Sequence, residues 1–427
     1  MEYETCEECK QKNTGLCWCN TCNAKRFQQN FKNWSSVLEW IPYDRFYNIE
    51  YIAKGGFGKV YRAIWIDGFI HHWDNKNQNW ERRYPNKNVA LKSLNNSQNV
   101  RLEFFNEITS HHKILDRDFY SSVIRLHGIT QDPDTKNYMM VLDYARNGSL
   151  RNYLDTNVKL SWLDKIFYLH NIVNGLNIIH ANELIHRDLH IGNILHTGNY
   201  IRTCITDMGL CKPADYIATE NTKNSTYGVL PYIAPEILRG QNYTKVADIY
   251  SFGIIMYEII SGLPPYHDVG HDQNLALKIC QGLRPRFDIK VPQLIVHLIK
   301  RCLDANQLNR PTASEIKNIL FQWYREQRTG RETELIKQIK EANAVNNKLQ
   351  PSNVTLTSLS YETHFEAIYT SRLLDFNNLP ESKNSANYYK QYDNIICTEY
   401  SENLQIDISQ LKINDDQNNE SKNEKSF

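Results

Sequence analysis

The residues with the clearest chemical potential lie in the middle of the chain, in the segment His186–Asn193. Within it Asp188 and Asn193 stand five positions apart, and Asp207 follows Asn193 after fourteen more. A carboxylate can accept or orient a hydroxyl proton, and carboxylate and amide oxygens are ligands that Mg²⁺ prefers. The residue types and spacing therefore suit phosphoryl transfer from a nucleoside triphosphate to a hydroxyl.

A glycine-rich turn earlier in the chain is a candidate phosphate cradle. It comprises Ile52, Ala53, Lys54, Gly55, Gly56, Phe57, Gly58 and Val60. Glycine lets backbone amides approach phosphate oxygens closely, and Val60 could cover a planar base. Ala53 replaces the first glycine of the usual pattern, and taken alone the turn also fits a plain hairpin.

A lysine at the end of an apolar run, Lys92 in Val89-Ala90-Leu91-Lys92, could hold the same phosphates. Glu107 follows fifteen positions later inside a helical candidate, and Glu103 lies one helical turn earlier. A Lys–Glu pair between strand and helix would orient the ammonium toward the α- and β-phosphates. We favour Glu107, with Glu103 as the alternative.

The elements that would position these residues change character along the chain. Five short β-branched or aromatic runs and one helical candidate, 100–115, come first. Helical periodicity follows over Trp162–His180 and over Val246–Ile260, which is apolar nearly all round like a buried helix. The strands are expected at Ile49–Ala53, Lys59–Trp65, Val89–Leu94, Val123–Ile129 and Tyr138–Tyr144. This order predicts an α+β fold of two lobes with a ligand cleft between them.

Composition divides the 427 residues into four parts. They are a Cys-rich start (1–30), a linker (31–44), the main domain (45–325) and a tail (326–427). In the tail, residues 331–347 predict a helix with Leu335, Ile336 and Ile339 on one face. Beyond Pro351 an excess of Asn, Ser, Lys and Glu predicts disorder.

Charge and cysteine usage bear on partners and location. The formal net charge of +1 gives no reason to expect nucleic acid or an anionic membrane surface as a partner. The start lacks the basic and apolar regions of a signal peptide, and Val246–Ile260 is too short to span a bilayer. Five of the ten cysteines crowd into residues 6–22, unlike a secreted disulfide framework. We expect a cytoplasmic protein with no membrane segment.

Residues 45–325 resemble a eukaryotic protein kinase domain of the tyrosine-kinase-like group. The resemblance rests on the ordered motifs: the glycine-rich turn, Val-Ala-Leu-Lys92, His-Arg-Asp188, Asp207-Met-Gly and Ala-Pro-Glu236. The Cys-rich start, the insertion Asp67–Lys87 and the sequence His-Arg-Asp-Leu-His resemble the expanded kinase families of mycorrhizal fungi. The resemblance implies the kinase fold, with a five-stranded N-lobe carrying one helix and a mainly helical C-lobe.

The resemblance also implies roles for the candidate residues. Asp188 would accept or orient the substrate hydroxyl, a task for which a carboxylate of ordinary pKa suffices. Asn193 and Asp207 would hold Mg²⁺ beside the phosphates of ATP. Arg187 would pair with a phosphate on the activation segment. The nucleotide site would further include Ala90, Lys92, the gatekeeper Leu142 and the hinge from Asp143 to Ala145.

Two structural roles follow from the same resemblance. Glu236 would pair with Arg310, which ties together segments far apart in sequence. Asp248 would brace the catalytic loop from the central helix.

Three departures from the kinase pattern bear on substrate class. Met208 replaces the usual Phe, and its flexible thioether can fill the same apolar slot. His190 stands where serine/threonine kinases carry Lys, so a neutral imidazole would assist the transferring phosphate less, and its contribution would vary with pH. Val229 replaces a Thr in the substrate-docking segment and so removes a hydroxyl.

The resemblance implies transfer of the γ-phosphate of ATP to serine or threonine of protein substrates in intracellular signalling, with tyrosine not excluded. The alternative is a pseudokinase scaffold that binds ATP and partner proteins. The presence of Lys92, Asp188, Asn193 and Asp207 favours activity. Candidate phosphoacceptors of the activation segment are Tyr216, Thr219, Thr222, Ser225, Thr226 and Tyr227. The insertion Asp67–Lys87 could dock a partner or cover a strand edge.

The Cys-rich start forms two knuckles, Cys6-x-x-Cys9 and Cys19-x-x-Cys22. Four thiolates from two such turns suit tetrahedral Zn²⁺, and so short a segment would need metal to fold. Cys17 competes with Cys19 as a ligand, and reduced cysteines on a flexible arm are the alternative. We expect this segment and the C-terminal tail to contact protein partners.

Overall fold

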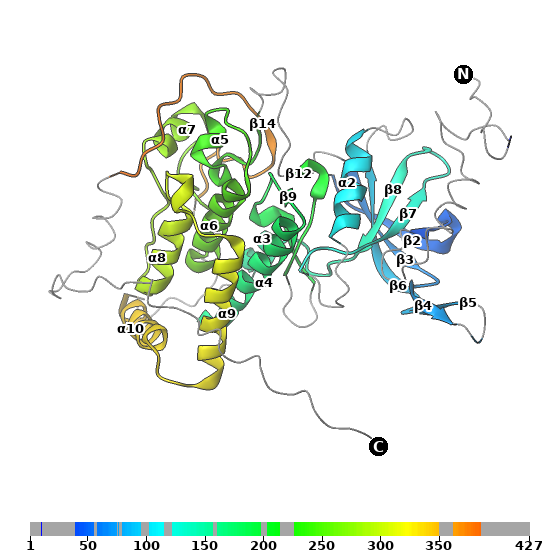
Figure 1. The fold of residues 1–427 in the computed structure, drawn as a ribbon, viewed down its shortest axis with the longest axis horizontal. Coiled ribbons are helices and arrows are strands. Elements are labelled where there is room, and N and C mark those ends of the chain that lie inside the picture. Colours follow the sequence, from blue (N-terminus) through cyan, green and yellow to red (C-terminus); the bar gives the residue numbers. More distant parts are fainter. Residues whose placement is uncertain are drawn as a thin grey trace, which may run out of the picture.

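The structure, a computed structural model, describes Lys10 and residues 39–54, 58–74, 76, 79–94, 102–114, 122–156, 160–197, 203–213, 226–349 and 362–385. These residues form one lobe built on a sheet and a second lobe built mainly of helices (Figure 1). The predicted α+β, two-lobed class is confirmed.

The N-terminal lobe is organised by a six-stranded sheet with the order β1-β7-β8-β6-β3-β2. Its strands are β1 (Glu39–Trp40), β2 (Phe46–Lys54), β3 (Gly58–Trp65), β6 (Lys87–Leu94), β7 (Leu126–Gln131) and β8 (Tyr138–Asp143). The five longer strands correspond to the five predicted ones, and neighbours among them pair antiparallel. The sixth strand, β1, pairs parallel with β7 and is too short for its alternation to be read from sequence.

This edge strand corrects the predicted linker 31–44. Glu39 and Trp40 pair with β7, and the backbone N–H of Ile41 donates to the Ile129 carbonyl at 2.9 Å. The Ile41 side chain is buried in the lobe core. The sheet-rich lobe therefore begins before residue 45, ahead of the short 3-10 turn η1 (Tyr43–Arg45).

The insertion Asp67–Lys87 contributes a hairpin, β4 (Phe69–Asp74) and β5 (Asn79–Arg83). Phe69 is buried in the same apolar cluster as Ala63 and Trp65. Arg82 places its guanidinium 5.9 Å from the Trp65 ring and forms an ion pair with Glu39. Of the two readings of this insertion, the structure shows it packed on the sheet.

The C-terminal lobe is a stack of helices around one large apolar core. Its helices are α3 (Leu150–Thr156), α4 (Trp162–Ala181), α5 (Pro235–Leu238), α6 (Lys245–Ser261), α7 (Gln273–Cys280), α8 (Gln293–Cys302), α9 (Ala313–Thr329) and α10 (Glu334–Leu349). A capping box between Ser161 and Asp164 starts α4 where the sequence predicted. Almost every residue of α6 is buried, as its uniformly apolar sequence indicated. The predicted helix at 331–347 is α10, which buries Leu335 and Ile339.

Short strands and 3-10 turns position the loops at the cleft. β9 (Leu184–Ile185) pairs with β12 (Lys212–Pro213), and β10 (Ile194–His196) pairs with β11 (Thr203–Ile205). The turns are η2 (Ile191–Asn193), η3 (Met208–Leu210), η5 (Leu230–Tyr232) and η6 (Gln307–Asn309). The remaining helix, α2 (Leu102–Lys113), belongs to the N-terminal lobe and lies beside η3.

The prediction of disorder beyond Pro351 does not hold for residues 362–385, which pack on the C-terminal lobe (Figure 1). In this segment β14 (Arg372–Leu374) pairs antiparallel with β13 (Thr226–Gly228). Leu374 is buried in the lobe core, and three aromatic or aliphatic side chains pack against it: Tyr369, Phe376 and Leu379. The polar average of the tail conceals this short apolar cluster, which is enough to order the segment on a larger core.

A buried ion pair fastens η6 to α5. Arg310 donates from both terminal nitrogens to the two Glu236 carboxylate oxygens, at 2.6 and 2.7 Å. It also donates to the backbone carbonyls of Asp304 and Val246, at 2.9 and 3.0 Å. The predicted tie between distant segments is present, with its remaining donors satisfied. In the part of the chain that the structure describes, no helix is long and apolar enough to cross a membrane.

This pair generates a stability prediction. Arg310→Met leaves the buried Glu236 carboxylate without its partner, which should lower the free energy of unfolding by about 3–5 kcal/mol. Denaturant titration measures the change. The double variant Glu236→Gln/Arg310→Met removes both charges and should recover part of the loss; equal losses in the two variants would contradict the role of the unpaired charge.

Candidate active site

The side chain of Lys92 joins both lobes. On β6 it lies opposite Val60 of β3 and Met140 of β8, on the sheet face toward α2. Its ammonium donates to Glu107 Oε1 at 2.7 Å and to Asp207 Oδ1 at 2.8 Å. Burial disfavours the charged ammonium, but the two carboxylates outweigh it and raise the pKa of Lys92. The lysine is therefore held as a cation in the cleft, and its partner is Glu107, the favoured of the two candidates.

A hairpin brings Asn193 next to Asp207 although fourteen residues separate them. Ile194 of β10 lies opposite Ile205 of β11, and the Thr206 N–H donates to the Asn193 carbonyl at 2.9 Å. Asp207 follows with φ of +60°, and the Asn193 amide nitrogen donates to the Asp188 carbonyl at 2.9 Å. An amide oxygen and a carboxylate thus line one point of the cleft, a donor set that suits Mg²⁺ shared with phosphate oxygens.

Asp248 of α6 holds the catalytic loop by its backbone. Its carboxylate accepts from the N–H groups of His186 and Arg187, at 2.8 and 3.0 Å, and bonds His180 Nε2 at 2.9 Å. Arg187 needs such support because its φ is +72°, in the left-handed region. This is the bracing position that the sequence assigned to Asp248.

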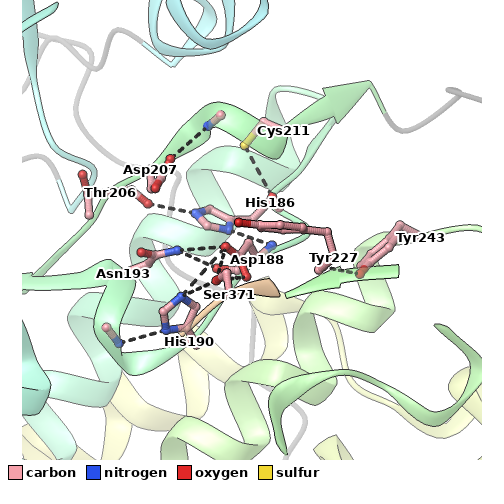
Figure 2. A network of polar contacts seen from close by, with 12 residues as sticks. His186, Asp188, His190, Asn193, Thr206, Asp207, Cys211, Tyr227, Tyr243 and Ser371 are labelled. Carbon is pink, nitrogen blue, oxygen red and sulfur yellow. Dashed lines mark hydrogen bonds and ion pairs between the residues drawn. The ribbon is translucent and has the colours of Figure 1, made fainter. Parts of the chain in front are cut away.

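His186 links the same loop to the segment that ends in Asp207 (Figure 2). Its Nε2 bonds the Thr206 carbonyl at 3.1 Å, and its Nδ1 accepts from the Asp188 N–H at 3.3 Å. Sequence reasoning quoted His186 in the motif but gave it no role. A buried histidine with two backbone partners fixes the distance between the two loops.

The Asp188 carboxylate is buried beneath β13. Burial raises its pKa to about 7; hydrogen bonds from Ser371 and Asn193 oppose the shift and nearby Asp207 adds to it. Gly228 lies so close that a Cβ there would come 3.3 Å from Asp188 Oδ1, and its φ of +149° also favours glycine. The carboxylate is therefore less acidic than the ordinary one the sequence suggested.

His190 points toward the same hydroxyl-binding position as Asp188. Its Nδ1 accepts from the Gly192 N–H at 3.2 Å, and its Nε2 lies 3.3 Å from Ser371 Oγ. Burial lowers the pKa of His190 to about 3, so the imidazole is neutral at physiological pH. The predicted neutral ring is present, but a contribution that varies with pH near neutrality is not supported.

Arg187 stacks its guanidinium 4.6 Å from the Tyr243 ring, and its buried Nε has no hydrogen-bond partner among the described residues. Its predicted partner, a phosphorylated activation segment, falls mostly outside the described residues. Four of the candidate acceptors lie there: Tyr216, Thr219, Thr222 and Ser225. Of the two described ones, Thr226 is buried and donates its hydroxyl to the Ile237 carbonyl at 3.1 Å. Met208 is fully buried in the lobe core, as expected of a Phe replacement.

The residues predicted to surround adenine lie along neighbouring strands. Ala53 pairs with Val60, and Ala90 lies opposite Leu142. The Asp143 side chain turns away to His127 Nε2 at 2.7 Å and Lys87 Nζ at 2.5 Å, partners that outweigh burial and hold its pKa well below the usual range. Ile52 and Lys54 lie near the tip of β2, and Ala145 follows β8. Gly55, Gly56 and Phe57 are outside the described residues, as are Cys6, Cys9, Cys19 and Cys22.

Ser371 is the site residue that sequence reasoning missed. It lies 183 positions from Asp188, yet its hydroxyl reaches both carboxylate oxygens, at 3.0 and 2.7 Å. No local motif marks it, because it sits in a polar tail beside a three-residue strand.

The fold and this constellation define a two-lobed phosphotransferase. Residues 47–320 match the family model described as protein tyrosine and serine/threonine kinase, and the chain belongs to that family.

The chain is similar to three relatives whose names are informative. It is 27% identical to a probable serine/threonine-protein kinase of Dictyostelium discoideum over 71% of this chain and 16% of that protein. It is 27% identical to mitogen-activated protein kinase kinase kinase 10 of Xenopus laevis, over 64% and 26% respectively. It is 28% identical to tyrosine-protein kinase SPK-1 of Girardia tigrina, over 63% and 50%. The chain thus spans half or less of the length of these relatives.

The Lys92 geometry generates a prediction with a matched control. Glu107→Gln weakens one of the two ion pairs that position the ammonium, and misplacement of that group should lower kcat/KM for phosphoryl transfer about 10²-fold. Steady-state kinetics with a fluorescent ATP analogue for binding measures the effect. Glu103→Gln, one turn earlier on α2, should behave as wild type; the reverse ranking would contradict the assigned pair.

Proposed function

We propose that this chain is an active ATP-dependent protein kinase that transfers the γ-phosphate to serine or threonine of protein substrates in intracellular signalling. The observation that carries the proposal is the cation of Lys92 held between Glu107 and Asp207, because this contact joins the sheet, α2 and the metal-binding loop at one point. A scaffold without activity would have no need for all three groups in contact. The pseudokinase alternative is therefore not favoured.

The chemistry follows from the positions of the side chains. Lys92 would bind phosphate oxygens of ATP, while Ala90 and Leu142 would border the base. Mg²⁺, held by Asn193 and Asp207, would supply neutralisation of the phosphate charge. Asp188 would orient the acceptor hydroxyl and receive its proton as the bond to phosphorus forms.

Serine and threonine are the favoured acceptors. The Dictyostelium relative is named a probable serine/threonine kinase, although the Girardia relative is named a tyrosine kinase. In this chain Asp188 and His190 are both buried and both lie within hydrogen-bond distance of a serine hydroxyl. A cytoplasmic location and a kinship with the fungal families remain predictions.

Asp188→Asn provides the test of activity. The amide cannot accept the hydroxyl proton, so phosphoryl transfer should fall by about 10²–10⁴-fold while ATP binding stays close to wild type. A radiolabelled autophosphorylation assay with phosphosite mapping measures activity and acceptor type together. Turnover equal to wild type in the variant would overturn the assigned role, and labelled tyrosine alone would overturn the acceptor class.

For the N-terminal cysteines we propose a Zn²⁺ site formed by Cys6, Cys9, Cys19 and Cys22, a proposal that rests on their spacing alone. The full chain purified without chelator should contain stoichiometric zinc by elemental analysis, and Cys9→Ser/Cys22→Ser should lose it. Cys17→Ser is the matched control and should retain it. A metal-free wild-type protein would favour reduced cysteines on an arm.

A further inference from the structure

The acceptor side of the active site is occupied by this chain's own tail. The Ser371 hydroxyl donates to Asp188, with Oγ 2.7 Å from Oδ2 and 3.0 Å from Oδ1, and His190 Nε2 lies 3.3 Å from the same oxygen (Figure 2). Asp188 itself is only 6% exposed. A protein substrate could not reach this carboxylate while Ser371 stays there.

The backbone of the segment is held on both sides of Ser371. After it, Arg372 to Leu374 pair with Gly228 to Thr226, so the tail adds a strand to the end of the activation segment. Before it, the Ile368 N–H donates to His271 Nδ1 at 3.0 Å, and the Tyr369 hydroxyl donates to the Pro265 carbonyl at 3.0 Å. Ser371 is therefore placed by its neighbours and not only by its own hydroxyl.

Further along, the segment lies against α7 and the following loop. The Lys383 N–H donates to the Cys280 carbonyl at 3.0 Å, and Asn384 Oδ1 accepts from the Ala305 N–H at 2.9 Å. Gly282 has φ of +102°, and a Cβ there would lie 2.4 Å from the Ser385 nitrogen. The groove thus fits this backbone closely over a distance well beyond one serine.

We propose that Ser371 is an intramolecular phosphoacceptor of this kinase, and that segment 362–385 occupies the protein-substrate site until Ser371 is phosphorylated. The inference rests on the proposed kinase function and adds to it a particular substrate, the chain's own tail. A serine next to Asp188 is a reactive group, whereas a segment that only blocks the site would need no hydroxyl at that position.

The hydrogen bonds around Ser371 leave its oxygen ready to react. Because His190 Nδ1 accepts from the Gly192 N–H, the proton of the neutral ring belongs on Nε2, which then donates to Ser371 Oγ. The Ser371 hydroxyl in turn donates to Asp188. A hydroxyl has two lone pairs, so one remains for bond formation. His190 is thus a positioning residue for the acceptor.

The reaction balances with ATP as the only co-reactant. Ser371 Oγ forms a bond to the γ-phosphorus, and the bond from that phosphorus to the β–γ bridging oxygen breaks. ADP leaves with the electron pair, and the hydroxyl proton passes to Asp188 and then to solvent. The products are phosphoserine 371, ADP and a proton.

Phosphorylation would expel the segment. Phosphoserine carries a charge of about −1.5 to −2 at pH 7, and beside the carboxylates of Asp188 and Asp207 this charge is repelled. Strand β14 is only three residues long, so little pairing opposes release. The site then becomes free for other substrates.

The test uses the full chain, treated with phosphatase and then given labelled ATP and Mg²⁺. Phosphosite mapping should find Ser371, with a half-time independent of protein concentration because the reaction is intramolecular. Phosphorylation of an added serine peptide should show a lag that matches labelling of Ser371. Ser371→Ala should lose both the Ser371 label and the acceleration, and Ser371→Thr should restore them in part.

Thr370 is the matched control, because it is adjacent and exposed. Thr370→Ala should keep both the label at Ser371 and the lag. Leu374→Asp disrupts the buried contact of the segment and should abolish the lag without prior labelling. Peptide phosphorylation with no label at Ser371, or with labelling that accelerates with protein concentration, overturns the inference. Absence of any transfer, equal to Asp188→Asn, would instead mean that the proposed kinase function itself has failed.

Discussion

The arrangement of the two lobes depends on one buried cation. Lys92 comes from the sheet, Glu107 from α2 and Asp207 from the C-terminal lobe, and the two ion pairs are 2.7 and 2.8 Å long. A buried ammonium is costly unless it is paired, so each carboxylate is stabilised only while the other two elements are in place. The cleft that would bind the nucleotide is therefore a consequence of this contact as well as of the lobes that form its walls.

A second buried charge, Asp248, does for the acceptor side what Lys92 does for the phosphate side. It fixes the backbone of His186 and Arg187, and His186 in turn bonds the Thr206 carbonyl just before Asp207. Asp207 thus stands where both systems meet, with its side chain on Lys92 and its backbone on the catalytic loop. The distance between bound phosphate and acceptor hydroxyl is set by these two charges together.

The sequence predicted the parts of the site that lie in ordered motifs with fixed spacing. Lys92, Asp188, Asn193 and Asp207 come together because a few strands and one hairpin fix their positions, and the choice of Glu107 over Glu103 awaited only the helix register. Strand β1 and the 362–385 segment escaped prediction for a different reason. Each has two or three paired residues and is ordered by packing on a distant core, which leaves no periodicity to read. Composition, averaged over the tail, pointed to disorder.

The histidine at position 190 shows how a departure from a family pattern can be misread when only the sequence is considered. A lysine there would attract the transferring phosphate, and its loss looked like a weakness. In the structure the neutral ring bonds the acceptor oxygen instead, with its other nitrogen fixed by Gly192. The Ser371 side chain is short, so its hydroxyl reaches Asp188 from a backbone that continues into β14; a tyrosine on the same backbone would carry its hydroxyl past the carboxylate. Since a tethered segment has a high effective concentration at the site, modest docking suffices to fill it, and the added charge of a phosphate suffices to empty it.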